Sequence, residues 1–221
     1  MSLDRERLTA ESVAAIAAMA AAPWTEEAYL AGSAALTLHL GHREVRDLDF
    51  MSATNRLRPA DRRDLLGEIL EVDPAARIET ARDGFLYARL ASGVAVRVYY
   101  YPYPLVDPVD ELDGIEVAAL TDLGLMKLAA IISRGARRDF IDLYCLCRQM
   151  PLTDLLERSP DKFGHVRDFP LQALKGLADL SQIEAEPMPA LREELAWAEV
   201  EEWVTAEVRR LGRKEIGLPL P

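Results

Sequence analysis

The sequence predicts an α+β fold, in which a mixed sheet with flanking helices is followed by a helical C-terminal half. Two apolar segments with alternating character, 85–90 and 94–100, are joined by Ala91-Ser92-Gly93 and indicate a β-hairpin. From Thr121 onward, apolar residues recur at helical spacing instead. Because the strands are grouped between helices, the arrangement is typical of α+β proteins. We therefore divide the chain into an α/β core at 1–120 and a helical half at 121–221.

Before the hairpin, helices and short strands follow one another. An Ala-rich helix is expected to begin at Thr9 or Ser12 and to run to Ala22, because Pro23 ends it. Pro59 suits the first position of a second helix, which is expected to run to about Leu70. Apolar runs predict further strands at Ala28–Ala31, around Ile78 and at Ile115–Leu120.

The C-terminal half is predicted to consist of helices. Thr121 is a suitable N-cap for the first, and Gly135 interrupts the pattern before a second helix that ends at Pro151. Trp197 and Trp203 are expected to anchor the last helix. Three further helices are predicted, at Thr153–Leu156, Leu171–Leu180 and Pro189–Leu211.

Composition excludes some classes of protein. Half of the 221 residues are hydrophobic, but no apolar run is long enough to span a bilayer, and no signal peptide is evident, so we expect a cytoplasmic protein. The net charge of −11 argues against a surface coated with basic residues for nucleic acid and favours a basic protein partner. Cys145 and Cys147 lie one residue apart in a helical pattern and are expected to pack rather than to form a disulfide.

The stretch from Ala31 to Met51 carries the clearest chemical signal. Asp47 and Asp49 alternate with large apolar residues, so both carboxylates should project from one face of a strand. Two neighbouring carboxylates repel each other unless a hard cation lies between them. Upstream, Gly32-Ser33 breaks an apolar run and could cradle phosphate where a helix begins. Each feature alone is more often a plain turn or a solvated strand edge, but together they indicate metal-assisted phosphoryl or nucleotidyl transfer.

This combination resembles the signature of the nucleotidyltransferase superfamily, which has an apolar-Gly-Gly/Ser turn, a spacer, and then Asp-apolar-Asp/Glu-apolar. The spacer between Ser33 and Asp47 is thirteen residues long. The resemblance implies a nucleotidyltransferase-like core with Mg²⁺ held by Asp47 and Asp49. Arg43 is placed to meet the triphosphate.

A second group of charged residues lies in the helical half. Lys127 is surrounded by apolar neighbours, and Asp139 and Asp142 are spaced to share one helical face. Arginines cluster just before these acids, at Arg134, Arg137 and Arg138. One interpretation is a salt-bridged corner between two helices. The other is that Lys127 and the arginines contact nucleotide phosphates or an RNA backbone.

Both groups together resemble the AbiEii/AbiGii abortive-infection toxins of type IV toxin–antitoxin systems, over residues 28 to 145. YPYPL at Tyr101–Leu105 and RRDFIDLY at Arg137–Tyr144 read like segments of that family. The resemblance implies transfer of a nucleotide from an NTP to an RNA (for example tRNA) or protein acceptor, with the helical half completing the nucleotide site. It also implies a small basic antitoxin encoded nearby. The site residues it implies are Asp47, Asp49 and Asp142 for catalysis, and Gly32, Ser33, Arg43, Lys127 and Arg134 for nucleotide binding.

One departure from the superfamily pattern leaves alternatives open. A third carboxylate is expected on a later strand, yet Val96–Tyr100 contains no acid, and Tyr99 is expected near the position of the missing group. Asp139 or Asp142 could supply it. Otherwise the chain is a catalytically weak nucleotide-binding or regulatory protein on the same fold. A third hypothesis is an interaction module whose acidic surface recruits a basic partner.

Overall fold

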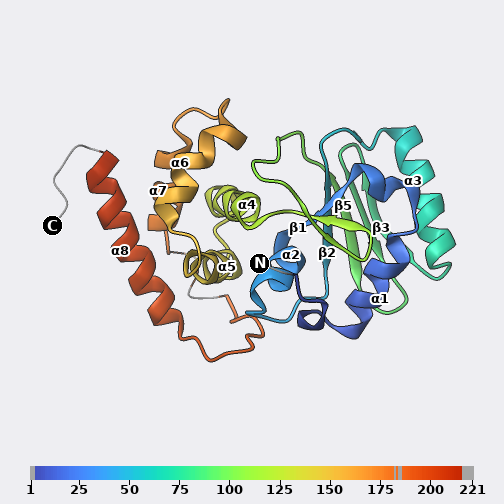
Figure 1. The fold of residues 1–221 in the computed structure, drawn as a ribbon, viewed down its shortest axis with the longest axis horizontal. Helices are drawn as coiled ribbons and strands as arrows, with labels where there is room; N and C mark the ends of the chain where they lie inside the picture. The colour runs from blue at the N-terminus through green and yellow to red at the C-terminus, as the bar shows by residue number, and fades with distance from the viewer. Residues whose placement is uncertain (1–2, 182, 184–185, 216–221) are drawn as a thin grey trace. The chain divides into compact units, whose positions relative to one another are not determined.

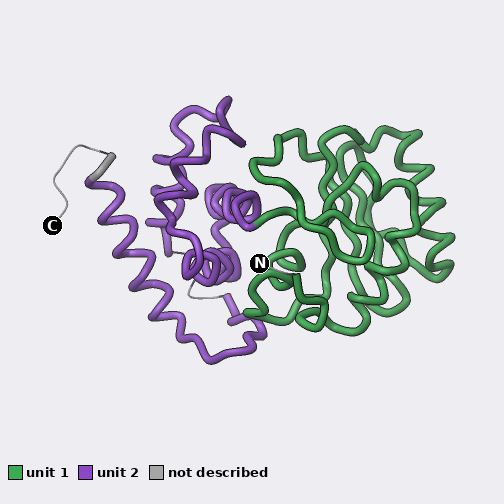
Figure 2. Tube along the Cα trace, viewed as in Figure 1, with its two compact units in different colours: residues 1–119 green, residues 120–221 purple. Residues whose placement is uncertain are grey.

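A computed structural model describes residues 3–181, 183 and 186–215. The chain divides into two compact units, residues 1–119 and 120–221, which Figure 2 shows in different colours. The first unit contains a mixed sheet with flanking helices, and the described part of the second is built from helices. This arrangement confirms the predicted α+β class. Among the described residues, no helix combines the length and the apolar character needed to cross a membrane.

The sheet of the first unit has the strand order β3-β4-β5-β2-β1-β7-β6. Its central strand, β2, runs antiparallel to β1 and parallel to β5. The predicted hairpin is confirmed as β4 and β5, which pair antiparallel. The strands are β1 Tyr29–Ala31, β2 Leu48–Ser52, β3 Arg77–Arg82, β4 Phe85–Arg89, β5 Ala95–Tyr100, β6 Asp110–Leu112 and β7 Ile115–Val117.

Local capping explains where the helices of this unit begin. Thr9 caps α1, since its hydroxyl accepts a hydrogen bond from the Ser12 N–H at 3.2 Å. Pro59 opens α3 as predicted, and the Asp61 carboxylate accepts the Arg58 N–H at 3.0 Å. The helices α1 and α3 contact each other beside the sheet (Figure 1). The helical segments are η1 Arg5–Arg7, α1 Ala10–Met19, η2 Pro23–Glu27, α2 Gly32–Leu40 and α3 Pro59–Val72.

The register of the sheet separates an apolar row of side chains from a polar one. The apolar row is fully or almost fully buried and consists of Leu30, Phe50, Val98 and Leu86 on four neighbouring strands. Trp24 of η2 packs edge-on against Phe50, with ring centroids 4.9 Å apart. The next row along the strands is Ala31, Asp49, Arg97 and Tyr87. Because successive residues of a strand point to opposite faces, this polar row lies on the other face of the sheet.

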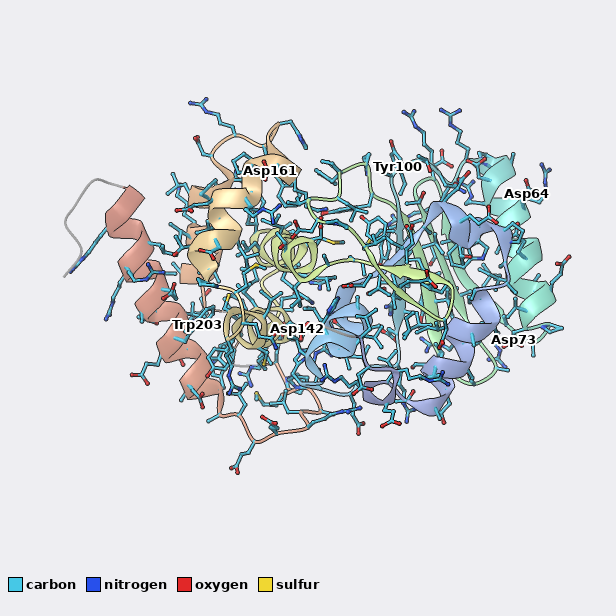
Figure 3. All side chains as sticks on the ribbon, in the orientation of Figure 1. Asp64, Asp73, Tyr100, Asp142, Asp161 and Trp203 are labelled. Carbon is cyan, nitrogen blue, oxygen red and sulfur yellow. The ribbon has the colours of Figure 1, made fainter. Side chains whose placement is uncertain are left out.

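The second unit contains α4 Leu120–Ser133, α5 Arg137–Cys147, α6 Leu152–Phe163, α7 Phe169–Ala178 and α8 Trp197–Glu215. Gly135 separates α4 from α5, as predicted, and takes a positive φ of 58°. Both tryptophans of α8 pack on α5, Trp197 against Phe140 and Trp203 against Tyr144. Their predicted anchoring role is therefore confirmed. Figure 3 labels Trp203 on α8. Cys145 and Cys147 are free thiols, as expected.

Several element boundaries differ from the prediction. Helix α1 ends at Met19 instead of Ala22, and α4 begins at Leu120, so Thr121 lies inside this helix and is not its N-cap. The strand expected at Ile115–Leu120 ends at Val117, and its three-residue partner β6 was missed because so short a strand shows no alternation. Helix α6 extends beyond Leu156 and through Pro160, because its buried residues, among them Phe163, pack on one face. Helix α8 begins at Trp197 instead of Pro189. No residue of 190–196 is buried, so helix propensity there has no packing to support it.

Candidate functional site

The turn between β1 and α2 lies against the second acid of the predicted pair. Ala31 pairs with Asp49 across β1 and β2, so the following Gly32 lies next to the carboxylate. Gly32 has a φ of 62°, and a Cβ there would come within 2.7 Å of Asp49 Oδ2. Glycine is therefore required both for the backbone conformation and for the close approach of the acid. Ala31, the N-cap of α2, provides no side-chain cap to the first turn of the helix.

Asp47 and Asp49 point to the same side of the sheet, as their alternation predicts. Asp47 directly precedes β2 and its side chain is 46% exposed, whereas that of Asp49, the second residue of the strand, is 22% exposed. Both carboxylates bind one guanidinium, that of Arg97. Nη2 of Arg97 donates to Asp47 Oδ2 at 2.8 Å, and Nη1 donates to Asp49 Oδ1 at 3.2 Å.

Arg97 is the functional residue that sequence reasoning missed. The parallel pairing of β5 with β2 places Arg97 directly opposite Asp49, whereas Tyr99 lies opposite Met51. Partial burial alone would lower the pKa of the Arg97 guanidinium, but its contacts with Asp47 and Asp49 outweigh burial and raise the pKa. Arg97 therefore stays positively charged. The only available signal was a charged residue in an otherwise apolar strand.

Tyr87 on β4 completes this row of side chains. It pairs with Arg97 across β4 and β5, and the guanidinium carbon of Arg97 lies 5.0 Å from the centroid of its ring. Arg89 lies over the same ring at 5.5 Å, and it donates hydrogen bonds to the Tyr87 hydroxyl and, at 3.2 Å, to the carbonyl of Gly93. Arg97 is thus held by two carboxylates on one side and an aromatic ring on the other.

The carboxylate oxygens of Asp47 and Asp49 are ligands of the kind that a hard cation prefers. Mg²⁺ prefers oxygen and is usually bound by one or two carboxylates together with water and substrate phosphates. Asp47 and Asp49 match that donor set. Within the described ranges, no group of three or more His, Cys, Asp or Glu side chains could hold a metal ion, so further ligands would not come from such a cluster.

Arg43 lies beside the Gly32-Ser33 turn. Its guanidinium donates a hydrogen bond to the Ser33 hydroxyl, and the residue is only 7% exposed. Its carbonyl accepts a hydrogen bond from the Thr37 hydroxyl at 3.3 Å, which fixes the segment after α2 against the helix. Five of the predicted residues, Gly32, Ser33, Arg43, Asp47 and Asp49, are therefore brought together in the first unit.

The remaining predicted residues lie in a cluster of the second unit, which we call the Lys127 cluster and which is buried except for the half-exposed side chain of Arg134. It comprises Lys127, Arg134, Asp139 and Asp142, the last on α5 in Figure 3. Nζ of Lys127 lies 3.0 Å from Asp139 Oδ1 and 2.7 Å from Asp142 Oδ2. Both aspartate side chains are fully buried, and that of Lys127 is 7% exposed.

Arg134 completes this cluster with a bidentate contact to the Asp139 carboxylate. Its Nε and Nη2 atoms donate to the two carboxylate oxygens, each at 2.8 Å. Burial alone would raise the pKa of Asp139, but the charges of Arg134 and Lys127 outweigh burial and lower the pKa. The contacts are those of the salt-bridged corner that the spacing allowed. The nucleotide-binding roles of Lys127 and Arg134, and the catalytic role of Asp142, stay predictions.

The sequence did not predict a second buried ion pair, which joins Lys162 and Asp122. Nζ of Lys162 on α6 lies 2.7 Å from Asp122 Oδ1 on α4, and both side chains are fully buried. Forty positions separate the two residues along the chain, so no local spacing could connect them.

Comparisons with known proteins show the family of this chain and relatives that resemble it. The family model described as nucleotidyl transferase AbiEii toxin, type IV TA system, matches residues 14–207. An uncharacterized protein of Aquifex aeolicus is 29% identical over 185 residues, which cover 82% of this chain and 86% of that protein.

Two solved structures resemble the fold. The nucleotidyltransferase toxin MenT4 of Mycobacterium tuberculosis superposes with a TM-score of 0.55 at 18% identity, covering 91% of this chain and 86% of its own. A nucleotidyltransferase candidate from Helicobacter pylori gives a TM-score of 0.54 at 18% identity, covering 91% of both chains. At these identities the likeness supports the nucleotidyltransferase fold. The family match covers most of the chain, and the protein therefore belongs to the AbiEii nucleotidyltransferase toxin family of type IV toxin–antitoxin systems.

Proposed function

We propose that this protein transfers a nucleotide from an NTP to an acceptor, using Mg²⁺ bound by Asp47 and Asp49. The observation that carries the proposal is the contact between the Gly32 turn and Asp49. It sets the start of a helix, where phosphate binds readily, next to a carboxylate suited to a hard cation. When bound, Mg²⁺ would neutralise charge on the transferred phosphoryl group.

Different residues of the chain would then bind phosphate and supply the remaining carboxylate. Gly32 and Ser33 shape the turn that receives phosphate, and Arg43, bonded to Ser33, adds positive charge beside it. Lys127 and Arg134 are proposed to bind nucleotide phosphates, and Asp142 to act as the third carboxylate. For Lys127 this role requires exchange of an aspartate partner for a phosphate, since both Asp139 and Asp142 now hold its ammonium group.

The partners of the reaction follow from family membership. A toxin of a type IV system implies an antitoxin, which we propose is a small basic protein encoded nearby. The net charge of −11 supports a basic partner on electrostatic grounds. We further propose that the acceptor is an RNA, such as a tRNA, or a protein, and that the reaction takes place in the cytoplasm.

Incubation with each radiolabelled NTP and Mg²⁺, together with total RNA or total protein, tests the proposal. Label transferred to one macromolecular fraction by the parent is the expected result. Asp49→Asn should abolish the transfer. Asp64→Asn is the matched control, because it removes the same charge from an exposed position on α3 and should leave the transfer unchanged. Equal label incorporation by all three proteins would overturn the assignment.

One observation favours a second candidate function, a nucleotide-binding protein with little turnover. The residue opposite Asp49 on β5 is the cation Arg97, and Arg97 bridges both acids. In this case calorimetry would detect Mg²⁺ and nucleotide binding while the labelling assay gave no product with either acceptor fraction.

A further inference from the structure

The two acids of the proposed metal site have a counter-cation within the protein. Arg97 lies 2.8 Å from Asp47 and 3.2 Å from Asp49, so its forked guanidinium spans the pair. Two carboxylates on one side of a sheet require positive charge to remain close together. A divalent metal is one source of that charge, and Arg97 is another.

Three features indicate that this contact is built into the fold. The register of β2 and β5 sets Arg97 directly opposite Asp49. Tyr87 lies under the guanidinium from the next strand and restricts where it can point. The Arg97 side chain is only 24% exposed, so water screens its contacts less than it screens those of an arginine on the surface.

We propose that Arg97 is a positioning residue that competes with the divalent cation for Asp47 and Asp49. It holds the two carboxylates together before the metal binds and must release them when the metal arrives. This inference rests on the proposed nucleotidyl transfer, because it assigns the metal to the same two carboxylates. Under this inference, the free energy of metal binding includes the cost of separating Arg97 from the carboxylates of Asp47 and Asp49.

The competition couples the metal to the nucleotide. A metal ion that arrives alone would leave the displaced guanidinium without its carboxylate partners. A metal ion that arrives with a nucleotide brings phosphate oxygens, to which a guanidinium binds as well as to carboxylates. Metal affinity should therefore rise strongly when nucleotide is present, and by reciprocity nucleotide affinity should rise with metal. Arg97 would in this way lower the affinity of Asp47 and Asp49 for metal ions that arrive without a nucleotide.

Mn²⁺ binding measures this competition without any need for turnover. The signal of free Mn²⁺ in electron paramagnetic resonance gives its affinity for the parent and for Arg97→Gln, with and without a non-hydrolysable ATP analogue or the corresponding GTP analogue. Without nucleotide, Arg97→Gln should bind Mn²⁺ about tenfold or more tightly than the parent. The gain in affinity on adding nucleotide should be correspondingly smaller in the variant.

Arg89→Gln provides the matched control. It removes an equal positive charge beside the ring of Tyr87, and Arg89 contacts the Tyr87 hydroxyl, Gly93 and Glu79 instead of the acid pair. A general electrostatic effect on cation binding would appear in both variants, whereas competition should appear in Arg97→Gln alone. Arg97→Lys keeps the charge but loses the fork that spans two carboxylates, so its Mn²⁺ affinity should lie between those of the parent and Arg97→Gln.

The outcomes separate this inference from the function on which it rests. A folded Arg97→Gln that binds free Mn²⁺ no more tightly than the parent overturns the competition, while nucleotidyl transfer stands. Failure of both Arg97 variants to fold, judged by circular dichroism, also overturns it and makes Arg97 a structural ion pair. Absence of Mn²⁺ binding in every protein, with or without nucleotide, overturns the metal site and the proposed function together.

Discussion

Lys127→Met is expected to destabilise the second unit strongly. The substitution keeps the apolar stem of the side chain and removes an ammonium group that holds two fully buried carboxylates. Asp139 retains its two hydrogen bonds from Arg134, so the loss falls mainly on Asp142, whose contact with Lys127 is the shorter. Removing one partner of a buried ion pair costs about 3–5 kcal/mol, and we expect a loss of free energy of unfolding in that range.

Urea denaturation followed by tryptophan fluorescence measures this loss. Trp197 and Trp203 both pack on α5, which carries Asp139 and Asp142, so in a Trp24→Phe background their emission reports on the cluster. Adding Asp142→Asn to Lys127→Met removes a buried negative charge that has lost its contact with the ammonium group, and should recover about 0.5–3 kcal/mol. A Lys127→Met protein with an unchanged midpoint would refute this reasoning about the fold, and weakened NTP binding by that protein would leave the proposed phosphate contact as the role of Lys127.

Three further predictions concern the stability of other elements. Gly32→Ala should cost about 1–2 kcal/mol of unfolding free energy, measured by urea denaturation followed by circular dichroism, from the positive φ of 62° alone, and should displace Asp49 as well. An unchanged midpoint would contradict the contact. Lys162→Met should cost about 3–5 kcal/mol, since fully buried Asp122 would lose its ion pair with the Lys162 ammonium group, and a tolerated substitution would contradict the importance of that pair. Burial lowers the pKa of His39 below 6.5, and it outweighs the hydrogen bond with the Ala118 carbonyl and the negative charge of Asp110, which act in the opposite direction. The unfolded chain therefore takes up this proton first as pH falls, so unfolding free energy should drop below about pH 6.5, and less so in His39→Gln.

The parts of the fold and the site that the sequence predicts are those determined by local pattern. Gly32-Ser33 and Asp47-Leu48-Asp49 are short motifs whose backbone conformations are specified by the residues themselves, and β1 and β2 then bring them together. The β4–β5 hairpin is specified by alternation on both sides of a short turn. Gly135 likewise marks the end of α4 through its own backbone preference.

What the sequence did not predict depends on register and on long-range packing. Arg97 contacts Asp49 from 48 positions away, and only the parallel pairing of β2 with β5 determines which residue of β5 faces the acid. A shift of register by one residue would turn a different side chain toward it. The pair Asp122 and Lys162 depends in the same way on the packing of α6 against α4. For Lys127 the sequence left Asp122 and Asp139 open as ion-pair partners. The structure shows that the partners are Asp139 and Asp142 and that both are fully buried.

Titration calorimetry of Mg²⁺ and NTP tests the central claim most directly. The claim is that Asp49, against the Gly32 turn, holds the metal that nucleotide binding requires. We predict that the parent and Asp64→Asn bind Mg²⁺ and nucleotide together, and that a folded Asp49→Asn loses most of this metal-dependent binding. Equal affinity of Asp49→Asn and the parent would contradict the claim.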